Sequence, residues 1–239
     1  ATWGELTGEI AQEIKSSFTS FTLEQNKLSA LALVSQDMLA LGPVWIDRYI
    51  REILYEALAF GLEKGILSGT GSNEPIGMDR EADDDSYFTV KSGYEQKTPI
   101  PVTSLDPESY GILLSKLAKT AKGNPRVVKN VILVVNPVDY LQKIMPATTI
   151  RGADGRYVND ILPYPTRVIQ SVEVTEGQAV IGLADRYWVG MGLVKDGKIE
   201  HADQYLFFED YRAYKIRFLG HGQPKDNNSF ALLDISGLQ

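Results

Sequence analysis

The 239-residue chain contains no cysteine, which excludes disulfide bonds, thiolate nucleophiles and cysteine-ligated zinc or iron–sulfur sites. Only two histidines occur, His201 and His221, and neither has a second histidine four residues away, as a zinc-binding H-E-x-x-H helix needs. The motifs G-x-S-x-G and S-x-x-K and the nucleotide-binding P-loop are also absent. We therefore expect no catalytic residues, no cofactor and no metal, and a structural or surface role for both histidines.

Long apolar runs and positive charge are lacking too. No apolar stretch reaches the ~18 residues of a membrane span, and the start, ATWGELTGEI, lacks the features of a signal peptide. The net charge is −7, and no dense Lys/Arg run occurs. This composition opposes tight binding of nucleic acid but permits weak, non-specific contact with packed DNA. We expect no membrane partner.

The clearest element present is a long amphipathic helix over residues 43–67. Pro43 suits its first turn. Apolar residues follow at the i, i+3, i+4, i+7 spacing that predicts one buried stripe: Val44, Ile46, Tyr49, Ile50, Ile53, Leu54, Ala57, Leu58 and Leu62.

The stretch after this helix, GTGSNEPIGM (69–78), has two interpretations. Closely spaced glycines can cradle a phosphate, but such a loop follows a strand, precedes a helix and carries a Lys-Ser or Lys-Thr pair. Here the helix comes first, no such pair follows, and Pro75 blocks continuation. We interpret the stretch as a helix stop with Gly69 as a left-handed residue after the cap. The acidic run READDD (80–85) indicates a solvated loop.

The middle of the chain predicts a mixed α+β arrangement. Asp106 is the expected N-cap of a helix over 107–122, with Pro107 at its first position. The continuous apolar run NVILVVNP (130–137) predicts a buried strand, and residues 138–145 a short helix.

From residue 150 the pattern is mostly β, with Arg151–Arg156 as a loop. Strands are expected over 167–174, 178–184, 186–194 and 211–219, with a hairpin signal in KDGK (195–198), a loop over 220–228 and a last strand in FALLDI. We expect Trp188 to be a core residue.

The first 26 residues cannot form a core of their own. Glu, Ser and Thr interrupt their apolar side chains, and a lone hairpin is marginal in water. We expect an extended hairpin that packs on a neighbouring subunit, with a disordered tail as the alternative. A strand over Leu28–Ser35 follows. The candidate assembly contacts are Trp3, Ile10, Phe18, Phe21 and Leu23.

The order of these elements resembles that of the major capsid proteins of tailed bacteriophages, which have the Hong Kong 97-type fold. KLSALALVSQDML (27–39) resembles the strand before the family's spine helix, and GTGSNEPIGM resembles its Gly-x-Gly, then Pro-x-Gly turn. VILVVNPVDYLQKI (131–144) resembles the strand, Asn-Pro and helix of the axial domain. AVIGLADRYWVGM (179–191), DQYLFFEDYRAYKIRFLGHGQP (203–224) and FALLDI resemble the later strands.

The resemblance implies a fold and a function. It implies an α+β fold with an extended loop at 1–26, a peripheral domain from 27–99 and 200–239 that includes the spine helix, and an axial domain at 100–199. Copies of the chain would form hexamers and pentamers of an icosahedral phage or prophage head around DNA. The protein would lie in the virion, and in the host cytoplasm before assembly, and would not be an enzyme. An encapsulin-type nanocompartment shell is one alternative, and an enzyme with an acidic active site is another.

Overall fold

The computed structural model describes residues 26–35, 37, 42–82, 93–193, 199–204 and 209–238. These residues form an α+β fold. Its first half consists of β1 (Asn26–Ser35), α3 (Pro43–Ser68), β2 (Ile100–Pro101), α4 (Pro107–Leu117), β3 (Val131–Val135), α5 (Pro137–Asp139), the π-helix η1 (Tyr140–Ile144) and α6 (Met145–Thr148). Its second half consists of β4 (Ile150–Arg151), β5 (Tyr157–Val158), β6 (Thr166–Gln170), β7 (Gln178–Leu183), η2 (Ala184–Arg186), β8 (Tyr187–Leu193), β9 (Glu200–Ala202), β10 (Tyr211–Pro224), η5 (Asn227–Ser229) and β11 (Phe230–Asp234).

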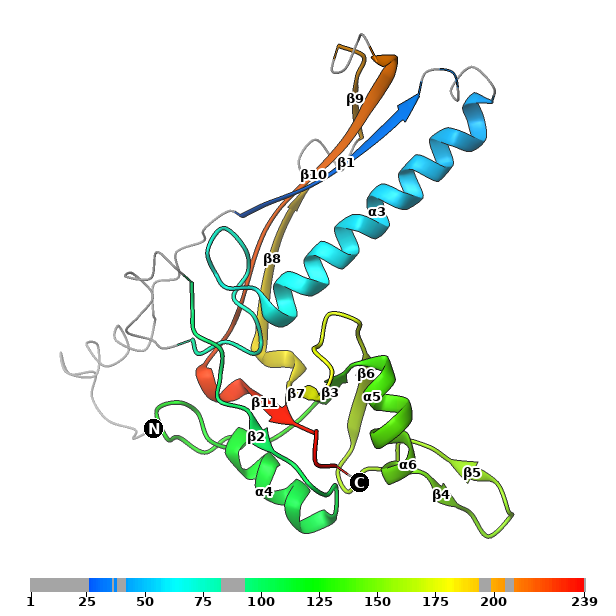
Figure 1. Cartoon of the computed structure of the whole chain (residues 1–239). Helices are drawn as coiled ribbons and strands as arrows, with labels where there is room; N and C mark the ends of the chain where they lie inside the picture. The colour runs from blue at the N-terminus through cyan, green and yellow to red at the C-terminus, as the bar shows by residue number, and fades with distance from the viewer. Residues whose placement is uncertain are drawn as a thin grey trace, which may run out of the picture.

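The described strands form two larger sheets, which Figure 1 shows one above the other. The first is antiparallel in the order β1-β10-β8. Strand β9 also pairs with β10, at residues 213–215, whereas β8 pairs with residues 218–224 of the same strand. The second has the order β2-β11-β7-β3-β6. The short β4–β5 hairpin projects from the lower part of the molecule (Figure 1).

Helix α3 lies along the first sheet and leads to the second (Figure 1). Ile46, Ile50 and Leu54 in its first half pack against Ala30 of β1 and Ile216 of β10. Its end reaches the second sheet, where Leu67 belongs to the cluster on one face. At 1.5 Å per residue, 26 residues span about 39 Å, long enough to connect both sheets.

The second sheet is covered on both faces. Successive side chains of a strand point to opposite faces. Val131, Leu133 and Val135 of β3 pack against α4 and η1, whereas Ile132 and Val134 face the cluster that contains Leu67. All five residues of β3 are buried, which explains why this strand is a continuous apolar run.

Several predicted elements are confirmed. The helix that follows Pro43, the strand before it, the buried strand at 131–135, the strand over 178–183 and the last strand all form. Asp106 caps α4 by accepting a hydrogen bond from Ser109 N at 2.8 Å. The predicted helix at 138–145 forms within a longer helical segment over 137–148. The KDGK hairpin lies outside the described residues.

Other boundaries were wrong. The helix expected over 107–122 ends at Leu117, because the chain then folds back and Ala118 O accepts from Arg126 N at 2.7 Å. The strand expected over 167–174 ends at Gln170. The loop expected over 220–228 is a strand as far as Pro224, because residues 218–224 pair with β8. Trp188, expected in the core, is only half-buried.

Candidate functional site

The turn after α3 is built around one carboxylate. Glu74 Oε1 accepts hydrogen bonds from Thr70 N and Thr70 Oγ1, both at 2.7 Å. Gly71 N donates to Pro75 O at 3.2 Å, and Gly77 N donates to Gly69 O at 2.8 Å. These backbone donors are therefore engaged within the turn, and a phosphate placed here would meet the negative charge of Glu74. The structure supports the helix stop over the nucleotide loop.

Gly69 ends the helix, but the predicted reason was wrong. Its φ of −59° and ψ of 140° are not left-handed. Space is what requires glycine, since a Cβ would lie 2.3 Å from Pro75 O and 2.4 Å from Gly65 O. The left-handed positions of the turn are Gly71 and Asn73, with φ of 82° and 60°.

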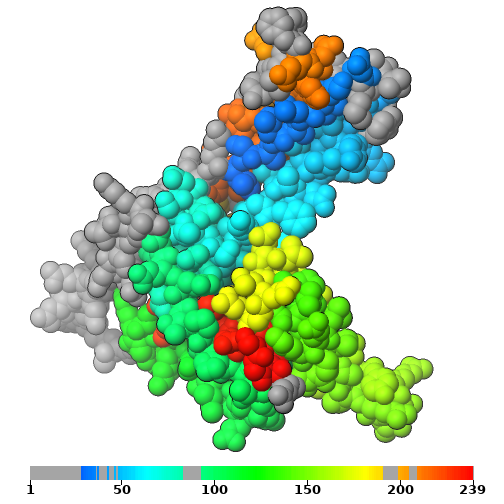
Figure 2. All heavy atoms as spheres, viewed as in Figure 1, coloured from blue at the N-terminus to red at the C-terminus, as the bar shows by residue number. Residues whose placement is uncertain are grey.

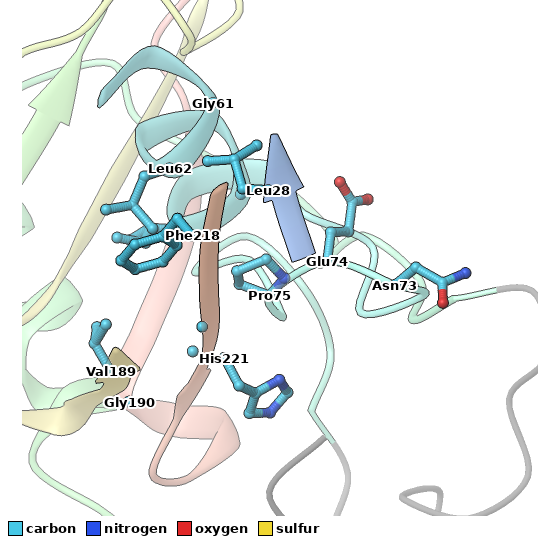
Figure 3. Close-up of a pocket in the computed structure, with 14 residues that line it drawn as sticks. Leu28, Gly61, Leu62, Asn73, Glu74, Pro75, Val189, Gly190, Phe218 and His221 are labelled. Atoms are coloured by element: carbon cyan, nitrogen blue, oxygen red, sulfur yellow. The ribbon is translucent and has the colours of Figure 1, made fainter. Parts of the chain in front are cut away.

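A small pocket lies between α3, the turn and the first sheet (Figure 3). Figure 3 shows Leu28, Leu62, Pro75 and Phe218 around this space. Its volume is about 80 Å³. Pockets for small-molecule ligands usually measure roughly 300 Å³ or more. The pocket is therefore a packing defect on the scale of a few water molecules.

The start of the acidic run, Arg80–Ala82, is not the solvated loop that was predicted, because Ala82 is buried, as is Asp79 just before the run. Asp79 is buried, and burial raises the pKa of its carboxyl although Arg80 opposes this effect. Gln96 Nε2 donates to Asp79 Oδ2 at 2.9 Å, and Arg80 Nη1 donates to Tyr94 O at 3.3 Å. These contacts hold the segment after α3 against the segment at 94–97. Asp83–Asp85 lie outside the described residues.

Lys97 is the buried cation of this region, with 7% of its surface exposed. Its Nζ donates to the carbonyl oxygens of Asn227 and Phe230, the latter at 2.7 Å. Burial lowers the pKa of Lys97 to about 8, and the nearby carboxylates of Glu81 and Asp226 oppose this shift. The side chain connects residue 97 to the start of β11.

Arg126 makes a second long-range connection. Its guanidinium donates to Leu117 O, Asp226 Oδ2 and Asn228 O, each at 2.5 Å. The ion pair with Asp226 is largely buried. Arg126 therefore joins the end of α4 to the segment between β10 and β11, and its role is structural.

Neither histidine forms a catalytic constellation in the described part of the chain. His221 is buried in β10, with its Nε2 3.3 Å from Gln223 Oε1. His201 lies in β9 beside the ring of Tyr214, with centroids 6.2 Å apart. Within the described ranges, no group of three or more His, Asp or Glu side chains is arranged to hold a metal ion.

Exposed apolar side chains occur on both parts of the molecule, and several of them lie on α3 and β1 in the upper, elongated part, which Figure 2 shows in blue and cyan. Ile53 and Phe60 of α3 are 39% and 45% exposed, and Leu31 and Leu33 of β1 are 58% and 44% exposed. Ile53 was predicted in the buried stripe of the helix. Only part of that stripe reaches the sheet, so apolar surface remains for contact with another molecule.

The predicted assembly contacts Trp3, Ile10, Phe18, Phe21 and Leu23 all lie outside the described residues, so the structure does not place them. Leu31, Leu33 and Phe60 were not among the predicted assembly contacts. In the sequence, Leu31 and Leu33 are marked by leucines that alternate with alanines along β1. Phe60 is marked as an apolar residue of the helix that lies outside the predicted buried stripe. No helix in the described ranges combines the length and apolarity needed to cross a membrane.

The fold thus consists of a long helix along one sheet, joined to a second sheet that is covered on both faces. This fold is similar to the capsid of a native GTA particle, with 12% identity over 87% of this chain and 72% of that chain and a TM-score of 0.57. A structure from Gordonia phage Cozz matches with 17% identity over 90% and 70% of the two chains and a TM-score of 0.57. An encapsulin complex from Synechococcus elongatus PCC 7942 matches with 12% identity over 88% and 73%, with a TM-score of 0.50.

The family model of the phage capsid family matches residues 1–234, and the chain belongs to this family. It is a structural capsid protein, as the resemblance noted in the sequence implied. The search of curated proteins found no match. The family and the similar structures indicate a structural role, self-association and a place in the virion.

Proposed function

We propose that copies of this chain form the hexamers and pentamers of an icosahedral phage head that encloses DNA. The chain would act only as a shell subunit, without enzymatic activity or cofactor. It would be present in the host cytoplasm before assembly. The observation that carries this proposal is the exposed apolar surface on α3 and β1 of a chain that belongs to the phage capsid family.

The position of this surface suits contact between copies. Leu31 and Leu33 alternate with Ala30 and Ala32 along β1, so they face away from α3. Ile53 and Phe60 lie seven residues apart on α3 and share one side of it. One molecule thus offers two separate apolar strips, and different neighbours in a ring can cover both strips at once.

We propose further that residues 1–26 form an extended loop that packs on a neighbouring subunit through Trp3, Ile10, Phe18, Phe21 and Leu23. The support is compositional, because apolar side chains interrupted by Glu, Ser and Thr need an outside surface for burial.

Hydrogen exchange tests this proposal. The amides of residues 5–25 should exchange within about seconds in unassembled subunits and be protected by orders of magnitude in shells. Buried β3 serves as the internal control, since its amides should be protected in both states. Strong protection of residues 5–25 at a concentration where no oligomer exists would show that they belong to the subunit's own core.

We also propose that the two sheets mark the peripheral and axial domains. The predicted division was 27–99 with 200–239, and 100–199. Sheet membership supports a modified division, in which β8 joins the peripheral part through β10, and β11 joins the axial part through β7. Limited proteolysis should cut the chain between segments that belong to different sheets, rather than within a strand of either sheet.

A nanocompartment shell is the second candidate, favoured by the structural similarity to the encapsulin complex. The contents of purified particles distinguish the two functions. Nuclease-protected DNA of genome length supports the phage head, and a co-purifying protein cargo without DNA supports the compartment. Among the described residues, no observation favours the alternative of an enzyme with an acidic active site.

A further inference from the structure

The charge of this acidic chain is unevenly distributed. Four segments at one end of the second sheet, residues 116–131, 164–170, 184–186 and 225–226, contain eight basic and two acidic residues. The whole chain has a net charge of −7. The excess of positive charge is therefore local, and the remainder of the chain is strongly negative.

The fold brings these four segments together around Asn130. Ala184 N donates to Asn130 O at 3.0 Å, and Asn130 Nδ2 donates to Asp185 Oδ2 at 2.6 Å. Lys225 Nζ donates to Asp185 O at 2.9 Å. The segments that carry the basic residues thus lie together at the end of the second sheet at which β3 and β6 begin.

An open hollow of about 480 Å³ lies at this end of the sheet, and it is lined by residues 129–131 and 164–167. Lys129 and Arg167 both line this hollow, and both are exposed. Lys119 and Lys122, also exposed, lie on the loop that folds back after α4. We call the three side chains Lys119, Lys129 and Arg167 the basic edge.

The two acidic residues of these segments are already engaged. Asp226 forms the buried ion pair with Arg126, and the Asp185 carboxylate accepts the hydrogen bond from Asn130. Asp226 is therefore paired with Arg126 rather than with the basic edge. Its positive charge is available to a partner from outside.

The chemistry of the edge identifies that partner. Lysine is a strongly hydrated point charge that is depleted in the cores of protein–protein interfaces and common in contacts with phosphates. In the loop that folds back after α4, Val127 is the exposed large apolar side chain. We propose that the basic edge binds the phosphate backbone of DNA, without sequence preference. This inference rests on the proposed function, because a head that encloses DNA brings the nucleic acid against its subunits.

The test is the salt dependence of DNA binding by the full chain. The probe is a fluorescent duplex of mixed sequence of about 30 base pairs, titrated in about 50 to 200 mM NaCl and followed by fluorescence anisotropy. The test variant is Lys129→Gln/Arg167→Gln. The matched control is Arg48→Gln/Lys64→Gln, which removes one Arg and one Lys from exposed positions on α3. A charge-retaining variant, Lys129→Arg/Arg167→Lys, reports on the fold.

Each lost phosphate contact lowers the slope of log K against log salt by about 0.9. The test variant should therefore lose about 2 from the slope and bind at least tenfold more weakly at about 100 mM NaCl. The control and the charge-retaining variant should bind as the wild type does. Electron microscopy should show shells for all the variants.

Three results would overturn the proposal. The first is a test variant that binds DNA like the wild type, which would leave the capsid function intact. The second is a test variant that retains DNA affinity but no longer forms shells, which would make the edge a contact between copies. The third is a wild type without measurable affinity at the lowest salt. If the wild type binds DNA through this edge yet forms no shell, the proposed function fails instead.

Discussion

The substitution Arg126→Met tests whether long-range polar contacts hold the second sheet to its surroundings. The variant keeps the aliphatic bulk but removes donors to Leu117 O, Asp226 and Asn228 O. Side-chain exposures of 5% for Arg126 and 17% for Asp226 leave the carboxylate poorly hydrated once its partner is gone. Breaking a buried pair in this way costs roughly 3–5 kcal/mol. Because Asp226 retains some water contact, we expect about 3 kcal/mol, which lowers Tm by roughly 6–12 °C for a domain of this size.

The assay is urea unfolding followed by tryptophan fluorescence, at a concentration where light scattering shows no assembly. Arg156→Met is the matched control, because Arg156 is 87% exposed and pairs with Asp154 at 3.8 Å. Its effect should stay within about 0.5 kcal/mol. The double variant Arg126→Met/Asp226→Asn should be less destabilised than the sum of its single changes. A loss below about 1 kcal/mol for Arg126→Met would refute the reasoning.

Three further predictions concern the region after α3. Gly69→Ala should lower Tm, since its Cβ would meet two carbonyl oxygens at 2.3 and 2.4 Å, and wild-type stability would mean that the turn adapts. The pKa of Lys97 is lower in the folded state, about 8 against 10.5, so the unfolded chain binds more protons between these values and stability rises with pH there. Between about pH 7.5 and 10, the free energy of unfolding of the wild type should therefore rise by up to about 3 kcal/mol relative to that of Lys97→Met. Parallel profiles of unfolding free energy against pH for the two proteins would contradict this. Calorimetry with ATP at about millimolar concentration should show no saturable heat, because Glu74 accepts from Thr70 N and backbone oxygens of the turn accept from Gly71 N and Gly77 N, which leaves these donors unavailable to a phosphate.

The elements that the sequence predicted well are those whose own periodicity matches their surroundings. The stripe through Ile46, Ile50 and Leu54 identified α3 because this side of the first half of the helix packs on a sheet. The run at 131–135 identified β3 because both faces of its sheet are covered.

The misplaced boundaries depend on residues distant in sequence. GHGQP reads locally as a loop because of its glycines. In the fold Gly220 and Gly222 lie beneath the rings of Phe218 and Tyr187, where a Cβ would approach ring atoms to 2.5 and 2.9 Å. Pairing with β8 therefore overrides turn propensity. The early end of α4 has a similar origin, since Leu117 O is bound by Arg126, whose partner Asp226 lies 100 residues away.

Surface features were the least predictable. Ile53 belongs to the apolar stripe of α3 by periodicity, and only the narrow contact with one sheet leaves it exposed. Residues 116–131 contain five basic and no acidic residues, but the position of Arg167 beside them depends on the pairing of β3 with β6, which the sequence does not show. A pattern in one chain reports which residues need burial, but not whether the covering surface comes from the same copy.

The central claim is that this chain is the subunit of a closed capsid. Cryo-electron microscopy of particles from cells that produce the protein tests it most directly. The account predicts closed shells of hexameric and pentameric rings, with density for α3 and both sheets in every subunit and with Leu31, Leu33, Ile53 and Phe60 covered by neighbouring copies. Subunits that stay monomeric at high concentration, or shells in which these four side chains face solvent, would contradict it.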